Sequence, residues 1–172
     1  MACQAAAEAY SQKKSERIIL TRPIVSVDED LGFLPGNIDE KMDPWTRPMF
    51  DIMSKYYSRS QLIQMVKSKS IEVSPLAYMR GRTFDDCFII GDEMQNSTPN
   101  QMKMMLTRLG EGSKMVITGD PRQCDLVESG LIDLVDRMGY RELDYLEHIE
   151  LGDEDIQRHE AVKEILNLYP PA

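Results

Sequence analysis

The sequence predicts a layered α/β domain built around a mainly parallel sheet. Short apolar segments, typical of strands buried on both faces, alternate along the chain with segments of helical character. Two of these apolar segments, CFII and MVIT, each run into Gly-Asp and are separated by a single helix. Strands that alternate with helices in this way form parallel sheets covered by helices. Because no internal repeat or low-complexity linker is visible, we expect one domain over residues 1–172.

The composition narrows the class of protein. A chain of 172 residues can bury a sizeable core, and 42% hydrophobic with 28% charged residues is typical of a soluble globular protein. The net charge of -9 argues against a generally basic surface that binds nucleic acid non-specifically. A local basic channel remains compatible with that charge.

The sequence shows no sign of membrane insertion or secretion. No apolar segment is long enough to span a bilayer, and the N-terminus lacks the apolar core of a signal peptide. The three cysteines form no CxxC pair and no His/Cys cluster of the kind that binds metals. These features predict a cytoplasmic protein that does not bind a membrane.

The first part of the chain is expected to contain a helix, a strand and a loop. MACQAAAEAYSQKKSE (1–16) is rich in alanine and predicts a helix that begins at the first residue without an N-cap. RIILTRP (17–23) predicts a short strand closed by its proline. SVDEDLGFLPGNIDEKMDP (26–44) is acidic, contains glycine and proline, and predicts a loop.

Two helices and a short strand are expected next. Asp43 and Pro44 provide an N-cap and a first-turn proline. A second helix is expected near Ser60, and IEVSPLAYMRGRTF (71–84) predicts a brief strand followed by an ordered loop. The side chains that the first helix turns inward are predicted to be Phe50, Ile52, Met53 and either Tyr56 or Tyr57.

The helix after the CFII strand carries clear signals at its ends. Thr98 is expected to cap it, with Pro99 in its first position and Gln101 completing a capping box. Gly110 is expected to end it. The inner face is predicted to consist of Met102, Met105, Leu106 and Leu109.

The last part of the chain repeats the alternation. SKMVITGDPRQ (113–123) predicts a strand that breaks at its Gly-Asp, and a helix is expected over 129–138, stopped by Gly139. YLEHIEL (145–151) alternates like a strand, and RHEAVKEILNLY (158–169) predicts a final helix.

Two adjacent acids follow the CFIIG segment directly. Asp92 and Glu93 would lie at the carboxyl end of a buried strand, which is the edge where open parallel sheets bind ligands. Acids at such a place cost desolvation energy unless a cation meets them. A magnesium ion would meet them, since it prefers carboxylates, waters and phosphate oxygens. The alternative is a strand that ends in solvent, with both acids as polar turn residues.

The second Gly-Asp brings further polar residues to the same edge. A right-handed strand–helix–strand unit lays its strands parallel, so Thr118, Asp120 and Gln123 are expected to share one rim with Asp92 and Glu93. Asp92 would hold magnesium through water, and Glu93 would orient or deprotonate an attacking water. Gln123 could sense a terminal phosphate. The alternative is that acids gather at strand ends because loops are polar.

A set of segments carries a family resemblance. In order, they are IILTRP, LGFLPG, DPWTRP, PLAYMRGRTF, IIGDEMQNSTPNQMKMMLTRLGEGSKMVITGDPRQCDL and SGL. The chain resembles PhoH-like proteins, P-loop ATPases related to the core of superfamily 1 helicases, from about Arg17 to about Tyr169. The residues from Tyr78 to Leu126 match most densely. The departures are small: Gly91 stands where a larger apolar residue is common, and Met94 where alanine is common.

The resemblance implies a fold, ligands and partners. The fold would be a three-layer RecA-like P-loop NTPase fold, and the activity magnesium-dependent hydrolysis of ATP linked to the binding or unwinding of RNA or single-stranded nucleic acid. IIGDE would be the Walker B strand. GDPRQ, which begins with Gly119 and Asp120, is similar to the helicase motif that couples phosphate state to bound nucleic acid. The family further implies a homo-oligomeric ring and a link to phosphate starvation.

The phosphate-binding motif of this fold, G-x-x-x-x-G-K-[ST], does not occur in the sequence. LGEGSKM (109–115) separates glycine from lysine by Ser113 and precedes a strand, whereas a P-loop follows one. The first 23 residues resemble the helix and strand that follow a P-loop, so we expect an N-terminally truncated fold with impaired turnover. Two alternatives stay open: an inactive remnant or assembly module, and a nucleotide-independent RNA-binding domain.

Four arginines are candidates for phosphate contacts. Arg80 and Arg82 flank a glycine in MRGRT, and the planar guanidinium suits phosphates of nucleotides and nucleic acids alike. A solvated loop explains this pair equally well. Arg22, between Thr21 and a proline, is similarly placed at a strand end. Arg158 resembles the late arginine of the family, which could reach a terminal phosphate in the same or a neighbouring subunit.

Overall fold

The computed structural model describes residues 1–23, 47–152, 155 and 159–168. The chain divides into two compact units, Met1–Leu134 and Val135–Ala172. The loop predicted over 26–44, including the proposed cap at Asp43 and Pro44, lies outside the described residues.

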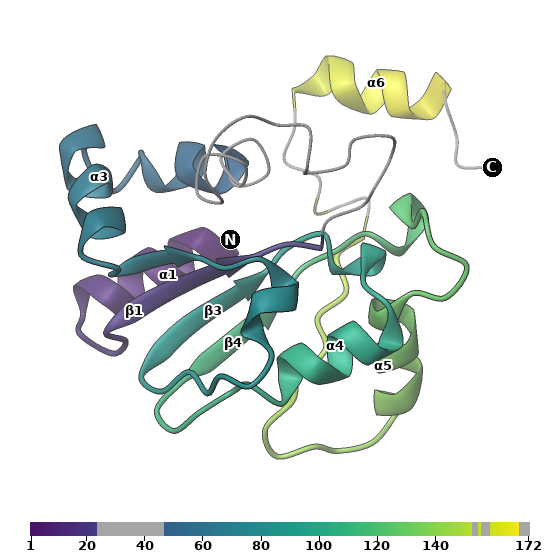
Figure 1. Ribbon diagram of the computed structural model, residues 1–172. Helices are drawn as coiled ribbons and strands as arrows, with labels where there is room; N and C mark the ends of the chain where they lie inside the picture. The colour runs from purple at the N-terminus through teal and green to yellow at the C-terminus, as the bar shows by residue number, and fades with distance from the viewer. Residues whose placement is uncertain (24–46, 153–154, 156–158, 169–172) are drawn as a thin grey trace, which may run out of the picture. The chain divides into compact units, whose positions relative to one another are not determined.

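The first unit contains a four-stranded parallel sheet in the order β2-β1-β3-β4. The strands are β1 (Arg17–Thr21), β2 (Ile71–Val73), β3 (Cys87–Gly91) and β4 (Lys114–Ile117). Figure 1 shows β1, β3 and β4 side by side. Since all four strands run in one direction, their carboxyl ends share one edge of the sheet, which confirms the predicted α/β fold.

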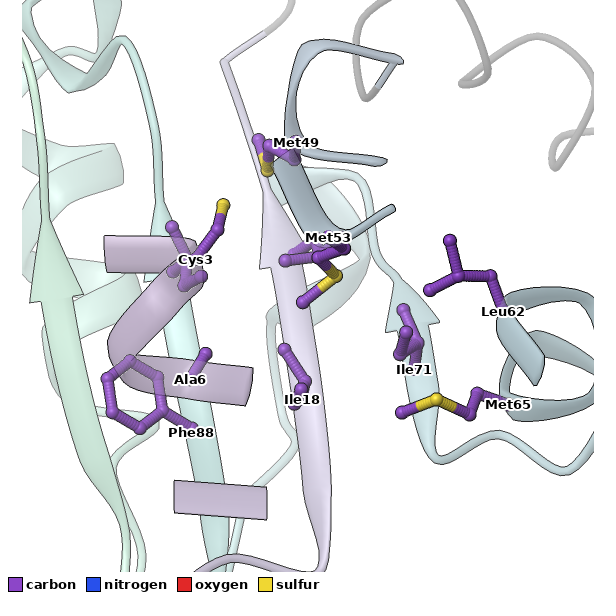
Figure 2. Close-up of a cluster of buried hydrophobic side chains, with 11 residues drawn as sticks. Cys3, Ala6, Ile18, Met49, Met53, Leu62, Met65, Ile71 and Phe88 are labelled. Carbon is purple, nitrogen blue, oxygen red and sulfur yellow. The ribbon is translucent and has the colours of Figure 1, made fainter. Parts of the chain in front are cut away.

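Helix α1 (Ala2–Ser11) covers one face of the sheet. It begins directly after Met1, which provides no side-chain cap, as predicted. Its buried Cys3 and Ala6 join Ile18 of β1 and Phe88 of β3 in one apolar cluster (Figure 2). The small side chains of α1 let its backbone lie close to the strands. The rest of the cluster comes from β1, β2, β3, the helical residues 47–53 and α3 (Arg59–Lys67): Leu20, Ile71, Ile90, Met49, Met53, Leu62 and Met65.

The opposite face is covered by η2 (Leu76–Met79), η3 (Met94–Asn96) and α4 (Pro99–Leu106). Ile19 and Ile89, which alternate with the residues facing α1, pack here against Met79 and Met105. Successive side chains of a strand point to opposite faces, so two clusters with alternating members mean a sheet covered on both sides. This is the three-layer arrangement of RecA-like domains.

The ends of α4 confirm one prediction and correct another. The Gln101 amide nitrogen lies 3.2 Å from Thr98 Oγ1, and Gln101 Oε1 accepts from the Thr98 amide at 2.9 Å, so the predicted capping box is present. The helix ends at Leu106, however, and not at Gly110. The helix stops because Phe84 pairs with the residues after α4. The Phe84 amide donates to the Arg108 carbonyl at 3.0 Å, and the Phe84 carbonyl accepts from the Gly110 amide at 2.9 Å.

The inward face of helix 47–53 is only partly as predicted. Met53 is fully buried, and Phe50 and Tyr57 pack against the first cluster, so the predicted choice between Tyr56 and Tyr57 is met by Tyr57. Ile52, in contrast, is exposed. Likewise Leu109, predicted to lie on the inner face of α4, is 46% exposed. The second helix begins close to the expected position, since α3 has a capping box formed by Ser58 and Gln61.

One of the predictions made for the last part of the chain, the strand over 145–151, is wrong. Helix α5 (Gly130–Met138) ends before Gly139, which has a φ of +51°, and α6 (Glu160–Leu168) forms as expected. The predicted strand over 145–151 does not form, and Tyr145 and Ile149 are 96% and 71% exposed. An alternating pattern becomes a strand only when a neighbouring strand supplies the ladder hydrogen bonds, and within the described residues none pairs with it.

None of the helices in the described ranges is long and apolar enough to cross a membrane.

Candidate functional site

The ends of β3 and β4 bring Asp92 and Thr118 into contact. Gly91 and Ile117, the last residues of the two strands, are partners in the ladder, so the residues that follow them are neighbours. Thr118 Oγ1 donates to Asp92 Oδ1 at 2.6 Å. The Asp92 amide donates to the Thr21 carbonyl at 3.0 Å, which ties the same point to the end of β1. Asp92 is therefore held where three strands end.

The first turn of α1 lies near the same carboxylate. Burial raises the pKa of the Cys3 thiol, and the negative charge of Asp92 raises it further. Sequence reasoning did not single out Cys3, because its position depends on how α1 packs on β3.

Glu93 adopts an unusual backbone conformation and has two side-chain partners. Its φ of 54° and ψ of 35° are left-handed, a conformation that side chains other than glycine adopt at some cost in energy. An Arg22 guanidinium nitrogen lies 3.3 Å from Oε1, and Gln95 Nε2 donates to Oε2 at 2.7 Å. The side chains of Arg22 and Glu93 are 25% and 35% exposed. The carboxylate is thus reachable from solvent but oriented from two sides.

Gln95 is a second residue that the sequence did not single out. It is fully buried, although an amide side chain is usually exposed. Besides its bond to Glu93, its Oε1 accepts from the Asp120 amide at 3.3 Å, and its Nε2 lies 3.4 Å from the Gln123 carbonyl. Its place in the sequence, two positions after the acid Glu93, could have marked Gln95 as a candidate. Only the packing reveals which groups it bonds.

Gly119 allows this arrangement. A Cβ atom at this position would lie 2.6 Å from Gln95 Oε1 and 2.7 Å from a methyl carbon of Leu131. The glycine in the second Gly-Asp therefore provides space for the side chain that joins the two strand ends. This is a packing requirement and involves no unusual backbone angle.

Asp120 organises the turn after β4, η4 (Pro121–Gln123). Its Oδ1 accepts from the Arg122 amide at 3.0 Å, and its Oδ2 accepts from Gln123 Nε2 at 2.9 Å. Partial burial acts to raise the pKa of Asp120, but the hydrogen bonds from Arg122 and Gln123 outweigh it and lower the pKa below its usual value. In this structure the Gln123 side chain is therefore directed at Asp120.

The structure does not bring Arg82 to this rim. Its guanidinium Nη2 donates to Glu72 Oε2 at 3.0 Å and its guanidinium carbon lies 4.5 Å from the centre of the Phe84 ring. Phe84 precedes β3, so Arg82 lies at the amino end of that strand, whereas Asp92 lies at the carboxyl end. Arg80 is exposed directly after η2. Arg158 lies outside the described residues.

The side chains at the carboxyl edge suit magnesium better than a metal ion whose ligands all come from protein side chains. No group of three or more His, Cys, Asp or Glu side chains that could hold a metal ion occurs within the described ranges. Asp92 provides one carboxylate, with the Thr118 hydroxyl beside it. Magnesium needs only one or two protein carboxylates, because waters and phosphate oxygens complete its octahedron.

Comparisons with known proteins agree on one family. The family model described as PhoH-like protein matches residues 1–170. A PhoH-like protein of Bacillus subtilis is 48% identical over 157 residues, which cover 90% of this chain and 49% of that protein. A PhoH-like protein of Mycobacterium bovis is 46% identical over 172 residues, which cover 98% of this chain and 48% of that protein.

A third relative gives the same picture. Protein PhoH of Escherichia coli K12 is 43% identical over 169 residues, covering 95% of this chain and 47% of that protein. The chain thus spans about half the length of the curated relatives it matches.

Proposed function

Because the chain belongs to the PhoH-like family, we propose that it takes part in magnesium-dependent hydrolysis of ATP, coupled to RNA or single-stranded nucleic acid. The observation that carries the proposal is the meeting of Asp92, Thr118 and Glu93 at the carboxyl edge of a parallel sheet. That edge is where such sheets bind ligands. An acid paired with a hydroxyl beside a second, oriented acid suits phosphate chemistry.

Each residue at the rim has a role in this proposal. Asp92, oriented by the Thr118 hydroxyl, would hold the metal through water. Bound magnesium would supply positive charge to the phosphate oxygens. The Glu93 carboxylate would orient the attacking water and accept its proton. The water oxygen bonds to the terminal phosphorus while the bond from phosphorus to the bridging oxygen breaks, and ADP leaves with that electron pair.

The two strand-end loops would respond together to the state of the phosphate. Gln95 joins Glu93 to the backbone of Asp120 and Gln123, so a shift of η4 would reach the water-activating carboxylate. In this proposal Gln123 senses the terminal phosphate by leaving its bond with Asp120. Asp120 then keeps its bond from the Arg122 amide, which preserves the turn.

A second candidate is a non-catalytic module that keeps the fold. The observation that favours it is the absence of G-x-x-x-x-G-K-[ST] from the sequence, since the amides of that loop would bind the phosphates. Among the described residues, those at the rim would serve the metal and the attacking water. Under the first proposal we therefore expect this chain by itself to hydrolyse ATP only weakly.

The test is phosphate release by the purified chain in ATP and magnesium. Glu93→Gln keeps the size of the side chain but removes the proton acceptor, and should lower the rate by about 10²- to 10⁴-fold. Glu16→Gln is the matched control, because Glu16 is exposed directly before β1, at the opposite end of the sheet. Its rate should equal that of the wild type.

Three results would count against ATP hydrolysis. One is phosphate release that Glu93→Gln leaves unchanged. Another is a folded chain that binds no nucleotide by calorimetry, which favours the non-catalytic module. The third is RNA affinity that falls steeply with salt and does not depend on nucleotide, which favours a simple RNA-binding domain.

A further inference from the structure

We propose that Arg22 is a positioning residue that fixes the orientation of the Glu93 carboxylate, and that it is not a phosphate ligand. This inference rests on the proposed function, in which Glu93 activates water. The ion pair joins an Arg22 guanidinium nitrogen to Glu93 Oε1 at 3.3 Å. The sequence alone had suggested a phosphate contact for this arginine.

The backbone holds Arg22 beside Glu93. Thr21 and Gly91 are ladder partners at the ends of β1 and β3, so the residues that follow them start from neighbouring points. Thr21 and Pro23, on either side of Arg22, are buried. The proline that follows restricts the backbone of Arg22 to extended conformations. The arginine is therefore anchored at its base, and only its side chain has freedom to move.

The backbone of Glu93 is equally constrained. Its left-handed conformation lies between two fixed neighbours, because the Asp92 amide donates to the Thr21 carbonyl and the Met94 amide donates to the Thr118 carbonyl, both at 3.0 Å. A residue other than glycine keeps such a conformation only where its surroundings demand it. The strained turn aims the Glu93 side chain toward the end of β1.

Two different donors then fix the carboxylate plane. Oε1 faces the Arg22 guanidinium, and Oε2 accepts from Gln95 Nε2 at 2.7 Å. Gln95 is fully buried and is held in turn by the Asp120 amide. A carboxylate that is bonded at both oxygens cannot rotate freely about its last side-chain bond. Each oxygen keeps a further lone pair, so the group can still accept a proton from water.

Arg22 is the charged partner of Glu93 among the contacts described above. Asp92 is the neighbour of Glu93 in the chain, whereas the Asp120 carboxylate is paired with Arg122 at 3.2 Å. Among these groups Arg22 supplies the positive charge that lies in contact with Glu93. Without it, the side-chain partner that remains for this carboxylate among the contacts of the described residues is the neutral amide of Gln95.

The test compares kcat and KM for phosphate release in two variants of Arg22. Arg22→Met keeps the length of the side chain without its charge, and should lower kcat by about ten- to hundredfold with little change in KM, as expected when a reacting group loses its orientation. Arg22→Lys should restore part of kcat. Arg59→Met, an exposed arginine in the first turn of α3, is the control and should match the wild type.

The outcomes distinguish a positioning role of Arg22 from phosphate binding. A rise in KM with unchanged kcat would mean that Arg22 binds phosphate, and a rise in kcat would mean that it restrains Glu93; either result overturns the inference. If the wild type shows no turnover, the proposed function fails and nuclear magnetic resonance of the labelled Glu93 carboxyl carbon decides. A signal that Arg22→Met moves and Arg59→Met does not supports the orientation, and one that neither moves refutes it.

Discussion

Replacing Gln95 by leucine should destabilise the fold through the two strand-end loops. Leucine has nearly the volume of glutamine, so the change removes hydrogen bonds without leaving a large cavity. The lost contacts are a bond to the Glu93 carboxylate at 2.7 Å and two longer ones to the backbone, from the Asp120 amide at 3.3 Å and to the Gln123 carbonyl at 3.4 Å.

The magnitude follows from the type and length of each bond. A hydrogen bond to a charged group contributes about 1.5–3 kcal/mol, and a neutral one about 0.5–1.5 kcal/mol. The two backbone contacts are long, and Glu93 is 35% exposed, so water can replace part of what is lost. The three contacts sum to about 2.5–6 kcal/mol, and because water replaces part of what is lost we expect the free energy of unfolding to fall by about 2 kcal/mol, slightly below the low end of that range.

The assay is urea unfolding followed by circular dichroism. With an m-value of about 2 kcal/mol/M, the urea midpoint should fall by about 1 M. The melting temperature should fall by about 4–8 °C. Gln64→Leu is the matched control, because Gln64 is exposed on α3, and its unfolding free energy should stay within about 0.5 kcal/mol of the wild type.

A double-mutant cycle tests the assigned partner. Combining Gln95→Leu with Glu93→Gln should give a coupling energy of at least about 0.5 kcal/mol, as residues in one hydrogen-bond network do. Two results would refute the reasoning: a loss of less than about 0.5 kcal/mol for Gln95→Leu, or strictly additive effects of the two changes.

Two further predictions concern stability. The Arg82 guanidinium holds the pKa of Glu72 below its usual value, so this pair stabilises the fold above the unfolded pKa of about 4.3, and the contribution is lost as the pH falls through the folded value. Because the Arg82 side chain is 37% exposed, Glu72→Gln should lower the free energy of unfolding by only about 0.5–1 kcal/mol at pH 7. In urea unfolding near pH 3, the difference between the variant and the wild type should be smaller. An equal difference at both pH values would contradict this. Thr98→Ala removes the cap of α4 and should cost about 1 kcal/mol by the same assay, whereas Thr98→Ser should keep most of it; equal losses would argue against the cap.

Elements with strong local signals were predicted correctly. β3 was read from an unbroken apolar run, and all its residues are buried. The start of α4 was read from Thr98, Pro99 and Gln101, which form their cap within one turn of chain. The contact between Asp92 and Thr118 was within reach of the sequence as well, because parallel strands joined by one helix bring their carboxyl ends to one edge.

Predictions failed where a distant partner decides the outcome. Leu109 was assigned to α4, but pairing with Phe84 draws this segment out of the helix. Residues 145–151 alternate like a strand, yet a strand needs a neighbour, and the described residues provide none. The position of Arg82 likewise depends on distant residues, since Glu72 and Phe84 hold its guanidinium at the amino end of β3.

The sequence by itself determined the four strands of the sheet, the N-terminal cap of α4 and the edge of the sheet on which the acids lie, because these depend on residues close together in the chain. Only the tertiary structure decided which side chains orient those acids. Arg22 meets Glu93 because β1 and β3 pair, and Gln95 reaches the turn after β4 because Gly119 leaves room for it. Such contacts join residues that are far apart in the chain, and no local pattern of residue types records them.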